Sequence, residues 1–147
     1  MFLGRYHHTI DAKGRLSIPG KYRDVLAKRY DDILVVTKDP ERCLAIHPME
    51  EWKRLAEKIQ AIPRTRQAVK DYKRFVHGEA MDCALDKQGR ILIPPELREF
   101  AGLDREAMLV GVDDHIEVWS MERWRLKSEQ MTQNMDHIVD AIADYGV

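Results

Sequence analysis

The sequence predicts an α+β fold made of two tandem β-hairpin modules with flanking helices. The segment Asp11–Arg15 (DAKGR) recurs as Asp86–Arg90 (DKQGR), and both copies are followed by a short apolar run that ends in proline, at Pro19 and Pro94. Strand-like and helix-like patterns follow each copy in the same order. Two copies of one motif with matching flanks indicate an internal duplication.

Composition places the chain among globular proteins of a reducing compartment. Its 147 residues are 44% hydrophobic, which is enough for a core in one domain or two small ones. Cys43 and Cys83 form no CxxC pair, so a cytoplasmic location is expected. No apolar run approaches the length that spans a bilayer, so no membrane partner is expected.

Charge is unevenly distributed although the formal net charge is only -1. Residues 1–30 carry seven Lys or Arg against two Asp or Glu, a net of +5. Residues 113–147 carry three against eight, a net of -5. The chain therefore has a basic N-terminal segment and an acidic C-terminal segment.

The first module begins with a predicted hairpin. Residues 5–10 alternate between inward and outward positions, as in an extended strand. Gly14 supplies the positive φ of a short loop, and residues 16–18 resume the alternation on a return strand. Pro19 ends that strand, and apolar spacing predicts a helix over residues 21–29.

Two further strands and two helices complete the first half. The β-rich runs at residues 33–37 and 43–47 predict strands. A helix begins near Pro48 and has Trp52 in its apolar stripe. Residues 64–77 then form a charged helix with a few apolar positions at helical spacing.

The second half repeats this plan at an offset of 75 residues, measured from Asp11 to Asp86, and the offset becomes 72 after the turn around Asp113, which is three residues shorter than its counterpart. The helix that carries Trp124 corresponds to the helix that carries Trp52, and both tryptophans are expected to be core or interface anchors. The expected organisation is a first repeat over residues 1–62, a linker helix over 63–76, a second repeat over 77–124 and a C-terminal helix over 125–147.

The C-terminal helix carries an apolar stripe in coiled-coil-like steps of four and three residues. Three arrangements fit this stripe: packing on its own chain, pairing with a neighbouring chain, or a frayed tail. Its members are Met131, Met135, Ile138, Ile142 and Tyr145.

The duplicated motif resembles the MraZ family, which belongs to the AbrB-like swapped-hairpin transcription factors with SpoVT-AbrB domains. The resemblance covers nearly the whole chain, including Met1–Gly4, both Asp-x-x-x-Arg hairpins, both Trp-bearing helices and Ala107–Gly111. It implies two AbrB-like modules with pseudo-two-fold symmetry that form a small β-barrel core. It also implies a nucleoid-associated bacterial regulator that binds direct repeats in double-stranded DNA as a ring homo-oligomer, at the promoter of the division and cell-wall gene cluster, its own included.

The same resemblance implies functional roles for the Asp and Arg of each motif. A guanidinium can donate two hydrogen bonds to guanine or contact a phosphate, and a two-stranded ribbon fits the major groove. An ion pair within each motif is the alternative, and both can hold because a carboxylate can orient the guanidinium while donors stay free. The candidate DNA contacts are Arg15, Lys13, Arg5, His7 and Lys21, with Asp11 as an orienting residue and Arg90 as a lesser candidate.

The two copies differ in charge. The second copy has Gln88 where the first has Lys13, and residues 77–106 carry four basic against seven acidic residues, a net of -3. Acidic surface weakens binding to a phosphate backbone. The first repeat is therefore expected to contact DNA and the second mainly to support assembly.

Other classes of function have little support in the sequence. It contains no Gly-rich phosphate loop, nucleophile elbow or HExxH motif, so no enzyme, cofactor or small-molecule substrate is expected. The six histidines are not at metal-ligand spacing with Cys or carboxylates, so no metal site is expected. The alternative function is an antitoxin-like or scaffolding interaction module that does not bind DNA.

Overall fold

A computed structural model describes residues 1–147 and confirms the α+β class. None of its helices is long and apolar enough to cross a membrane. The eight strands and six α-helices are, in chain order, β1 (Arg5–Thr9), β2 (Arg15–Ser17), α1 (Gly20–Arg29), β3 (Ile33–Lys38), β4 (Leu44–Pro48), α2 (Met49–Gln60), α3 (Gln67–Val76), β5 (Met81–Ala84), β6 (Arg90–Leu92), α4 (Pro95–Ala101), β7 (Glu106–Val112), β8 (His115–Trp119), α5 (Met121–Gln133) and α6 (Met135–Ile142), followed by a 3-10 turn at Ala143–Tyr145.

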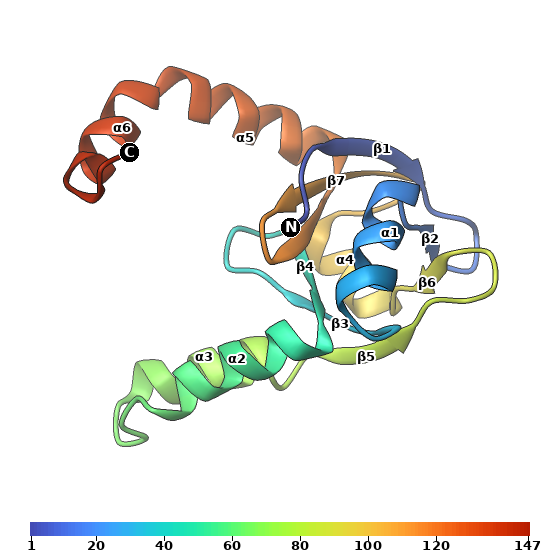
Figure 1. The fold of residues 1–147 in the computed structure, drawn as a ribbon, viewed down its shortest axis with the longest axis horizontal. Coiled ribbons are helices and arrows are strands. Elements are labelled where there is room, and N and C mark those ends of the chain that lie inside the picture. The colour runs from blue at the N-terminus through green and yellow to red at the C-terminus, as the bar shows by residue number, and fades with distance from the viewer.

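The strands form one antiparallel sheet and one short ribbon (Figure 1). The sheet has the order β1-β7-β8-β4-β3-β5, and β2 pairs with β6 in the two-stranded ribbon. Exchanging each strand for its counterpart in the other repeat leaves this order unchanged, because β5 to β8 correspond to β1 to β4. A pseudo-two-fold axis therefore passes between β4 and β8 and between β2 and β6.

The predicted pairing within each hairpin is wrong. β1 pairs with β7 and β2 pairs with β6, so a single bridge between Ile10 and Leu16 joins β1 to β2. The turn itself forms, since the Asp11 amide donates to the Arg15 carbonyl over 3.0 Å. A three-residue strand such as β2 is too short for a stable isolated hairpin, and Leu16 becomes fully buried only against the other repeat. The two repeats thus exchange strands and share one core.

The closed barrel implied by the resemblance does not form. β1 and β5 are the two edges of the sheet, and they do not pair with each other. The β2–β6 ribbon lies between these edges (Figure 1), but its ladder bonds join β2 to β6. The Ile10–Leu16 bridge and a 2.8 Å hydrogen bond between His8 Nδ1 and the Ser17 carbonyl tie the ribbon to the sheet. The core is therefore covered by an open sheet and a short ribbon.

Helices α1 and α4 contribute equivalent residues to this shared core, which is one cluster of 19 buried residues. Tyr22 of α1 is 1% exposed, and its hydroxyl donates to the Gly4 carbonyl over 2.5 Å. The rings of Phe2 and Tyr6 meet Tyr22 edge-on at centroid distances of 5.7 and 5.1 Å. Leu97 of α4 is buried at the corresponding place in the second repeat. The predicted buried face of the helix after Pro19 is confirmed.

Helices α2 and α3 form an arm that projects from the sheet (Figure 1). The Trp52 ring lies 4.8 Å from His77 and 5.7 Å from His47, and His47 stacks on His115 of β8 at 5.1 Å. Trp52 is partly buried, as expected of an anchor at the base of this arm. Burial lowers the pKa of His47 to about 4, and repulsion from His115 acts in the same direction.

The free energy of unfolding is expected to fall as the pH is lowered from about 6.5 towards 4. The unfolded chain protonates His47 near its ordinary pKa of 6.5, whereas the folded chain resists protonation down to about 4. The unfolded state therefore binds more protons in this window, and the contribution of His47 is at most about 3 kcal/mol. Urea unfolding across this pH range measures the effect. His47→Asn should flatten the dependence, and an unchanged slope in that variant would contradict the assignment.

The C-terminal segment consists of two helices. At the start of α5 the Ser120 hydroxyl accepts a hydrogen bond from the Arg123 amide, and α5 ends before Asn134. Helix α6 then continues in a new direction (Figure 1). The break interrupts the predicted stripe, so the stripe does not form one continuous seam, nor does it pack on its own chain. Four of its members are exposed: Met135, Ile138, Ile142 and Tyr145.

Candidate nucleic-acid interface

The Asp11 carboxylate organises the first turn. One of its oxygens accepts hydrogen bonds from the backbone amides of Lys13 (3.0 Å) and Arg15 (2.9 Å), and the other accepts from Arg15 Nε (2.7 Å). The Arg15 amide is the main cause that lowers the pKa of Asp11. Asp11 is therefore ionised at neutral pH, where it fixes both the turn and the direction of the Arg15 side chain.

The second turn repeats this arrangement. Asp86 accepts from the amides of Gln88 (2.8 Å) and Arg90 (2.9 Å) and from Arg90 Nε (3.1 Å). Its pKa is also lowered, chiefly by the Arg90 amide. In both turns the arginine uses Nε for orientation and keeps its terminal nitrogens for other partners.

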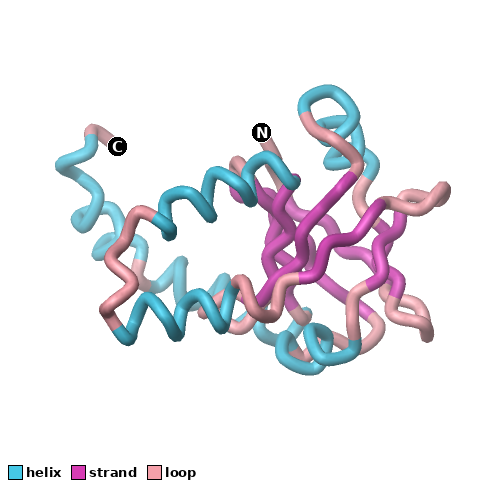
Figure 2. The backbone as a smooth tube through the Cα atoms, turned by 90° about the horizontal axis from the view of Figure 1, so that it is seen from below, coloured by secondary structure: helices cyan, strands magenta, loops and turns pink.

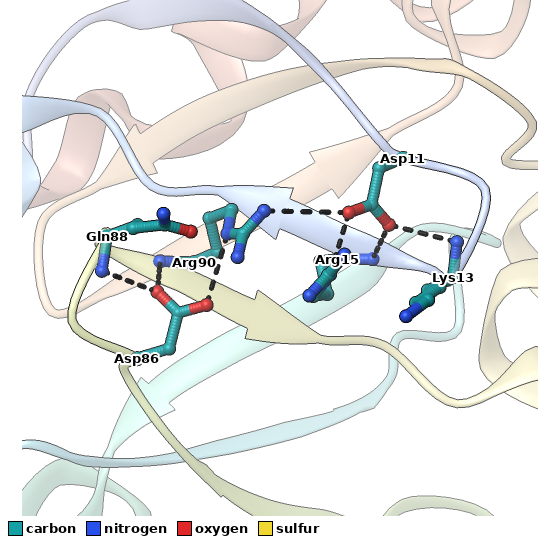
Figure 3. Close-up of polar contacts among 6 residues, drawn as sticks. All are labelled: Asp11, Lys13, Arg15, Asp86, Gln88 and Arg90. Carbon is teal, nitrogen blue, oxygen red and sulfur yellow. Dashed lines mark hydrogen bonds and ion pairs between the residues drawn. The ribbon is translucent and has the colours of Figure 1, made fainter.

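The β2–β6 ladder brings the two turns into one site (Figure 3). Arg90 stands opposite Ser17 in the ladder, and Arg90 Nη1 lies 3.6 Å from Asp11 Oδ2. The two motifs therefore share one charge network. The side chains of Arg15 and Arg90 are 35% and 27% exposed. The ribbon thus presents two oriented and partly exposed guanidinium groups.

Arg23 and Arg98 support the turns, and the sequence reasoning missed both. Gly14 has φ +87°, and a Cβ there would lie 2.8 Å from Arg98 Nε of α4. Gly89 has φ +73°, and a Cβ there would lie 2.7 Å from Arg23 Cδ of α1. Each arginine also donates through Nε to a backbone carbonyl, at 3.1 Å for Arg23 and 3.0 Å for Arg98. Each turn is therefore covered by an arginine of the opposite repeat. The sequence did indicate a shared role for these two arginines, because Arg23 and Arg98 are 75 residues apart, as are Asp11 and Asp86.

Gly14→Ala is expected to lower the free energy of unfolding by about 1–3 kcal/mol, because alanine is strained at this positive φ and its Cβ displaces the Arg98 side chain. Urea unfolding measures the change. Gly20→Ala is the matched control: Gly20 opens α1, lacks a positive φ and has its nearest neighbour, Arg23 Nη2, at 3.6 Å. An equal loss in both variants would contradict strain at the turn.

Three of the predicted DNA contacts lie apart from the turn network. Arg5 lines the same surface pocket as Trp124 of α5, His7 Nε2 lies 3.2 Å from Glu106 Oε1 of β7, and Lys21 borders a surface pocket at the N-terminus. The cause is the strand exchange: β1 pairs with β7, so the outer face of β1 does not continue the face of the ribbon. The structure brings together Asp11, Lys13, Arg15 and Arg90.

The second turn is as basic as the first. Gln88 takes the place of Lys13, but Lys87 takes the place of Ala12. Each turn therefore has one lysine, one arginine and one aspartate, and Lys13 and Lys87 are both exposed. A functional difference between the turns cannot come from a lost lysine.

Comparison with known proteins identifies the family. The sequence profile described as "MraZ protein, putative antitoxin-like" matches the chain twice, over residues 1–75 and 76–143. The chain belongs to the MraZ family. Each MraZ match contains one Asp–Arg turn, so the repeat of the family corresponds to the duplication in this sequence.

Full-length relatives support the same assignment. The protein named "Transcriptional regulator MraZ" of Desulfitobacterium hafniense is 42% identical, and that of Moorella thermoacetica is 39% identical, each over 100% of both chains. The MraZ protein of Lachnoclostridium phytofermentans is 44% identical over 100% of this chain and 99% of its own. The solution structure of PHS018 from Pyrococcus horikoshii covers 80% of this chain and 88% of that chain at 18% identity, with a TM-score of 0.34.

Proposed function

We propose that this MraZ-family protein is a transcriptional regulator that binds double-stranded DNA through the β2–β6 ribbon. The observation that carries the proposal is the joined pair of turns, in which each carboxylate orients a guanidinium through Nε and the terminal nitrogens of Arg15 remain available. The relatives from three bacteria are named transcriptional regulators, which supports the same role here.

The chemistry of the ribbon suits duplex DNA. A two-stranded β-ribbon fits the major groove, where a guanidinium can donate to O6 and N7 of one guanine. Lys13 and Lys87 sit at the exposed turns, and their ammonium groups suit phosphate contacts. Phosphate contacts fix the register of a protein on the duplex, whereas base contacts supply sequence preference. The lysines would therefore position the ribbon, and Arg15 would select the base.

Within the ribbon, the first turn is proposed to make the stronger contact. Arg15 pairs with Asp11 alone, whereas Arg90 lies close to both Asp86 and Asp11. Two carboxylates neutralise the Arg90 charge more completely and occupy more of its donors. The net charges of the two segments also favour DNA contact by the first turn, with +5 over residues 1–30 and -3 over residues 77–106. Arg5, His7 and Lys21 remain candidates for flanking phosphate contacts.

Assembly into a ring is part of the proposal, because one ribbon contacts few bases and several ribbons would engage direct repeats together. The α2–α3 and α5–α6 arms extend away from the turns (Figures 1 and 2). Residues 49–76 carry eight Lys or Arg against four Asp or Glu, and residues 128–147 carry four acidic residues and no Lys or Arg. Opposite charge on two different surfaces of one chain favours a head-to-tail contact between copies, and such contacts can close into a ring.

The proposed target is the promoter of the division and cell-wall gene cluster, including the gene for the protein itself. Genomic fragments bound by the purified protein are sequenced, and the enriched fragments are then titrated at increasing salt. A regulator enriches few fragments, which share direct repeats, and its affinity falls steeply with salt because condensed counterions are released. An antitoxin-like or scaffolding module would enrich nothing and would show no salt-dependent binding to duplex DNA.

A further inference from the structure

Three side chains with metal-binding chemistry meet far from the ribbon. Asp39 and Cys43 lie at the turn between β3 and β4, and Glu117 lies on the neighbouring strand β8. Each offers one ligand atom, and the three atoms lie within 4.8 Å of one another. Asp39 and Cys43 come from the first repeat and Glu117 from the second, so the pairing of β4 with β8 creates the group.

The Cys43 thiol is enclosed within this group. Cys43 is 0% exposed and forms no disulfide. Its carbonyl accepts a hydrogen bond from the Asp39 amide over 3.0 Å, whereas its thiol has no hydrogen-bond partner. Its sulfur lies within 4.8 Å of a carboxylate oxygen of Asp39 and one of Glu117. A buried thiol in this setting is poorly satisfied as it stands, and a bound cation would give it a strong partner.

The two carboxylates are oriented but have no positive partner. Asp39 Oδ1 accepts from the Glu41 amide over 2.8 Å, and Glu117 Oε1 accepts from Trp119 Nε1 over 3.0 Å. Neither carboxylate has a Lys, Arg or His nitrogen within 4.0 Å. Lys127 pairs with Glu41 instead. One N–H donor on one carboxylate oxygen, with the second oxygen left over, is a common arrangement around metal ligands.

We propose that Asp39, Cys43 and Glu117 bind one Zn²⁺ ion, with water as the fourth ligand. A thiolate together with carboxylates suits zinc, whereas Mg²⁺ and Ca²⁺ take oxygen ligands. Tetrahedral zinc places its ligand atoms about 3.3–3.8 Å apart, so side-chain shifts of roughly 1 Å complete the site. On binding, the Cys43 S–H bond breaks, its proton passes to solvent, and a sulfur–zinc bond forms without any change in oxidation state.

The position of this zinc site indicates a structural role. It joins the β3–β4 turn to β8 beneath the first turns of α5, where Arg123 Nη1 donates to the Arg42 carbonyl over 2.9 Å and Lys127 contacts Glu41. Bound zinc would therefore link the two repeats and steady the base of the α5–α6 arm.

Titration of the reduced, chelator-treated full-length protein with Co²⁺ tests the site, because a cobalt–thiolate bond gives a near-ultraviolet charge-transfer band. One Co²⁺ per chain should bind and be displaced by Zn²⁺, and Zn²⁺ should raise the melting temperature. Cys43→Ser should abolish the band, and Glu117→Gln and Asp39→Asn should each weaken binding by about 100-fold or more. Cys83→Ser is the matched control and should bind normally.

The absence of a charge-transfer band, a band that persists in Cys43→Ser, or a band lost in Cys83→Ser would each overturn the proposal. Circular dichroism checks that the variants fold. If Cys43→Ser does not fold, the partly exposed positions Asp39 and Glu117 decide the question, since unchanged Co²⁺ affinity in both variants overturns it equally. These readouts do not depend on DNA binding, so they stand apart from the proposed regulatory function.

Discussion

Arg15→Ala should lower the affinity of the protein for its DNA site by about 10- to 100-fold, since one bidentate arginine contact to a base contributes roughly 1–3 kcal/mol of discrimination. Asp11 already orients the guanidinium through Arg15 Nε, so the variant removes a preordered pair of donors. Arg90→Ala should cost about tenfold or less, because Arg90 is shared between two carboxylates. Fluorescence anisotropy on an enriched duplex, at one fixed salt concentration, measures both variants.

Two further variants sharpen this test. Arg125→Ala is the control, because Arg125 is exposed on α5, pairs only with Glu129 and lies outside both the ribbon and the basic segment 49–76, so DNA affinity should not change. Arg15→Lys keeps the charge but loses the planar fork, so it should retain a phosphate contact and lose a base contact. A greater loss in Arg90→Ala than in Arg15→Ala would assign the main contact to the second turn. Wild-type affinity in both would exclude the ribbon as the binding surface.

Truncation after Gln133 should abolish ring assembly and lower operator affinity by about 10²- to 10⁴-fold, because linked binding sites gain that much from simultaneous engagement. The truncation removes α6, most of the exposed apolar stripe and three of the four acidic residues in residues 128–147. None of the removed residues belongs to the buried core, so the free energy of unfolding of the monomer should change little. Sedimentation velocity and anisotropy measure the two effects on the same samples.

A charge variant separates electrostatic from apolar contributions to assembly. Replacement of Asp136, Asp140 and Asp144 by Asn keeps the stripe but removes the negative charge, so assembly should weaken at low salt and resemble the wild type at high salt. An oligomer of unchanged size after truncation would exclude α6 from the interface. A truncated monomer with full operator affinity would exclude assembly from the binding mechanism.

The order of the elements could be predicted from the sequence because it depends on local patterns. The alternation of inward and outward positions predicted β1, a proline predicted the start of α1 and of α2, and Gly14 predicted the turn. The ion pair between Asp11 and Arg15 was also accessible, since both residues lie within one turn and the motif occurs twice. Each of these features depends only on residues that are close to one another in the sequence.

Strand partners could not be predicted in the same way. A periodic pattern shows that Leu16 has a buried face, but it does not show that Ile91 of the other repeat stands opposite. The same limit led to the wrong hairpin pairing, whereas the expected barrel came from the family resemblance. Arg23 and Glu117 were missed because their partners come from the opposite repeat. The outer face of β1 was assigned to the ribbon for the same reason.

Strand exchange also determines when, during synthesis, the chain can form the β2–β6 ribbon. β1 needs β7 and β2 needs β6, so the N-terminal strands leave the ribosome long before their partners exist. Pairings so distant in sequence form late and slow the folding of a chain. A prematurely terminated first repeat would carry the basic segment and the Arg15 turn but no ribbon. If the ribbon binds DNA as proposed, operator occupancy would be restricted to chains translated at least through β7, and incomplete products would be excluded.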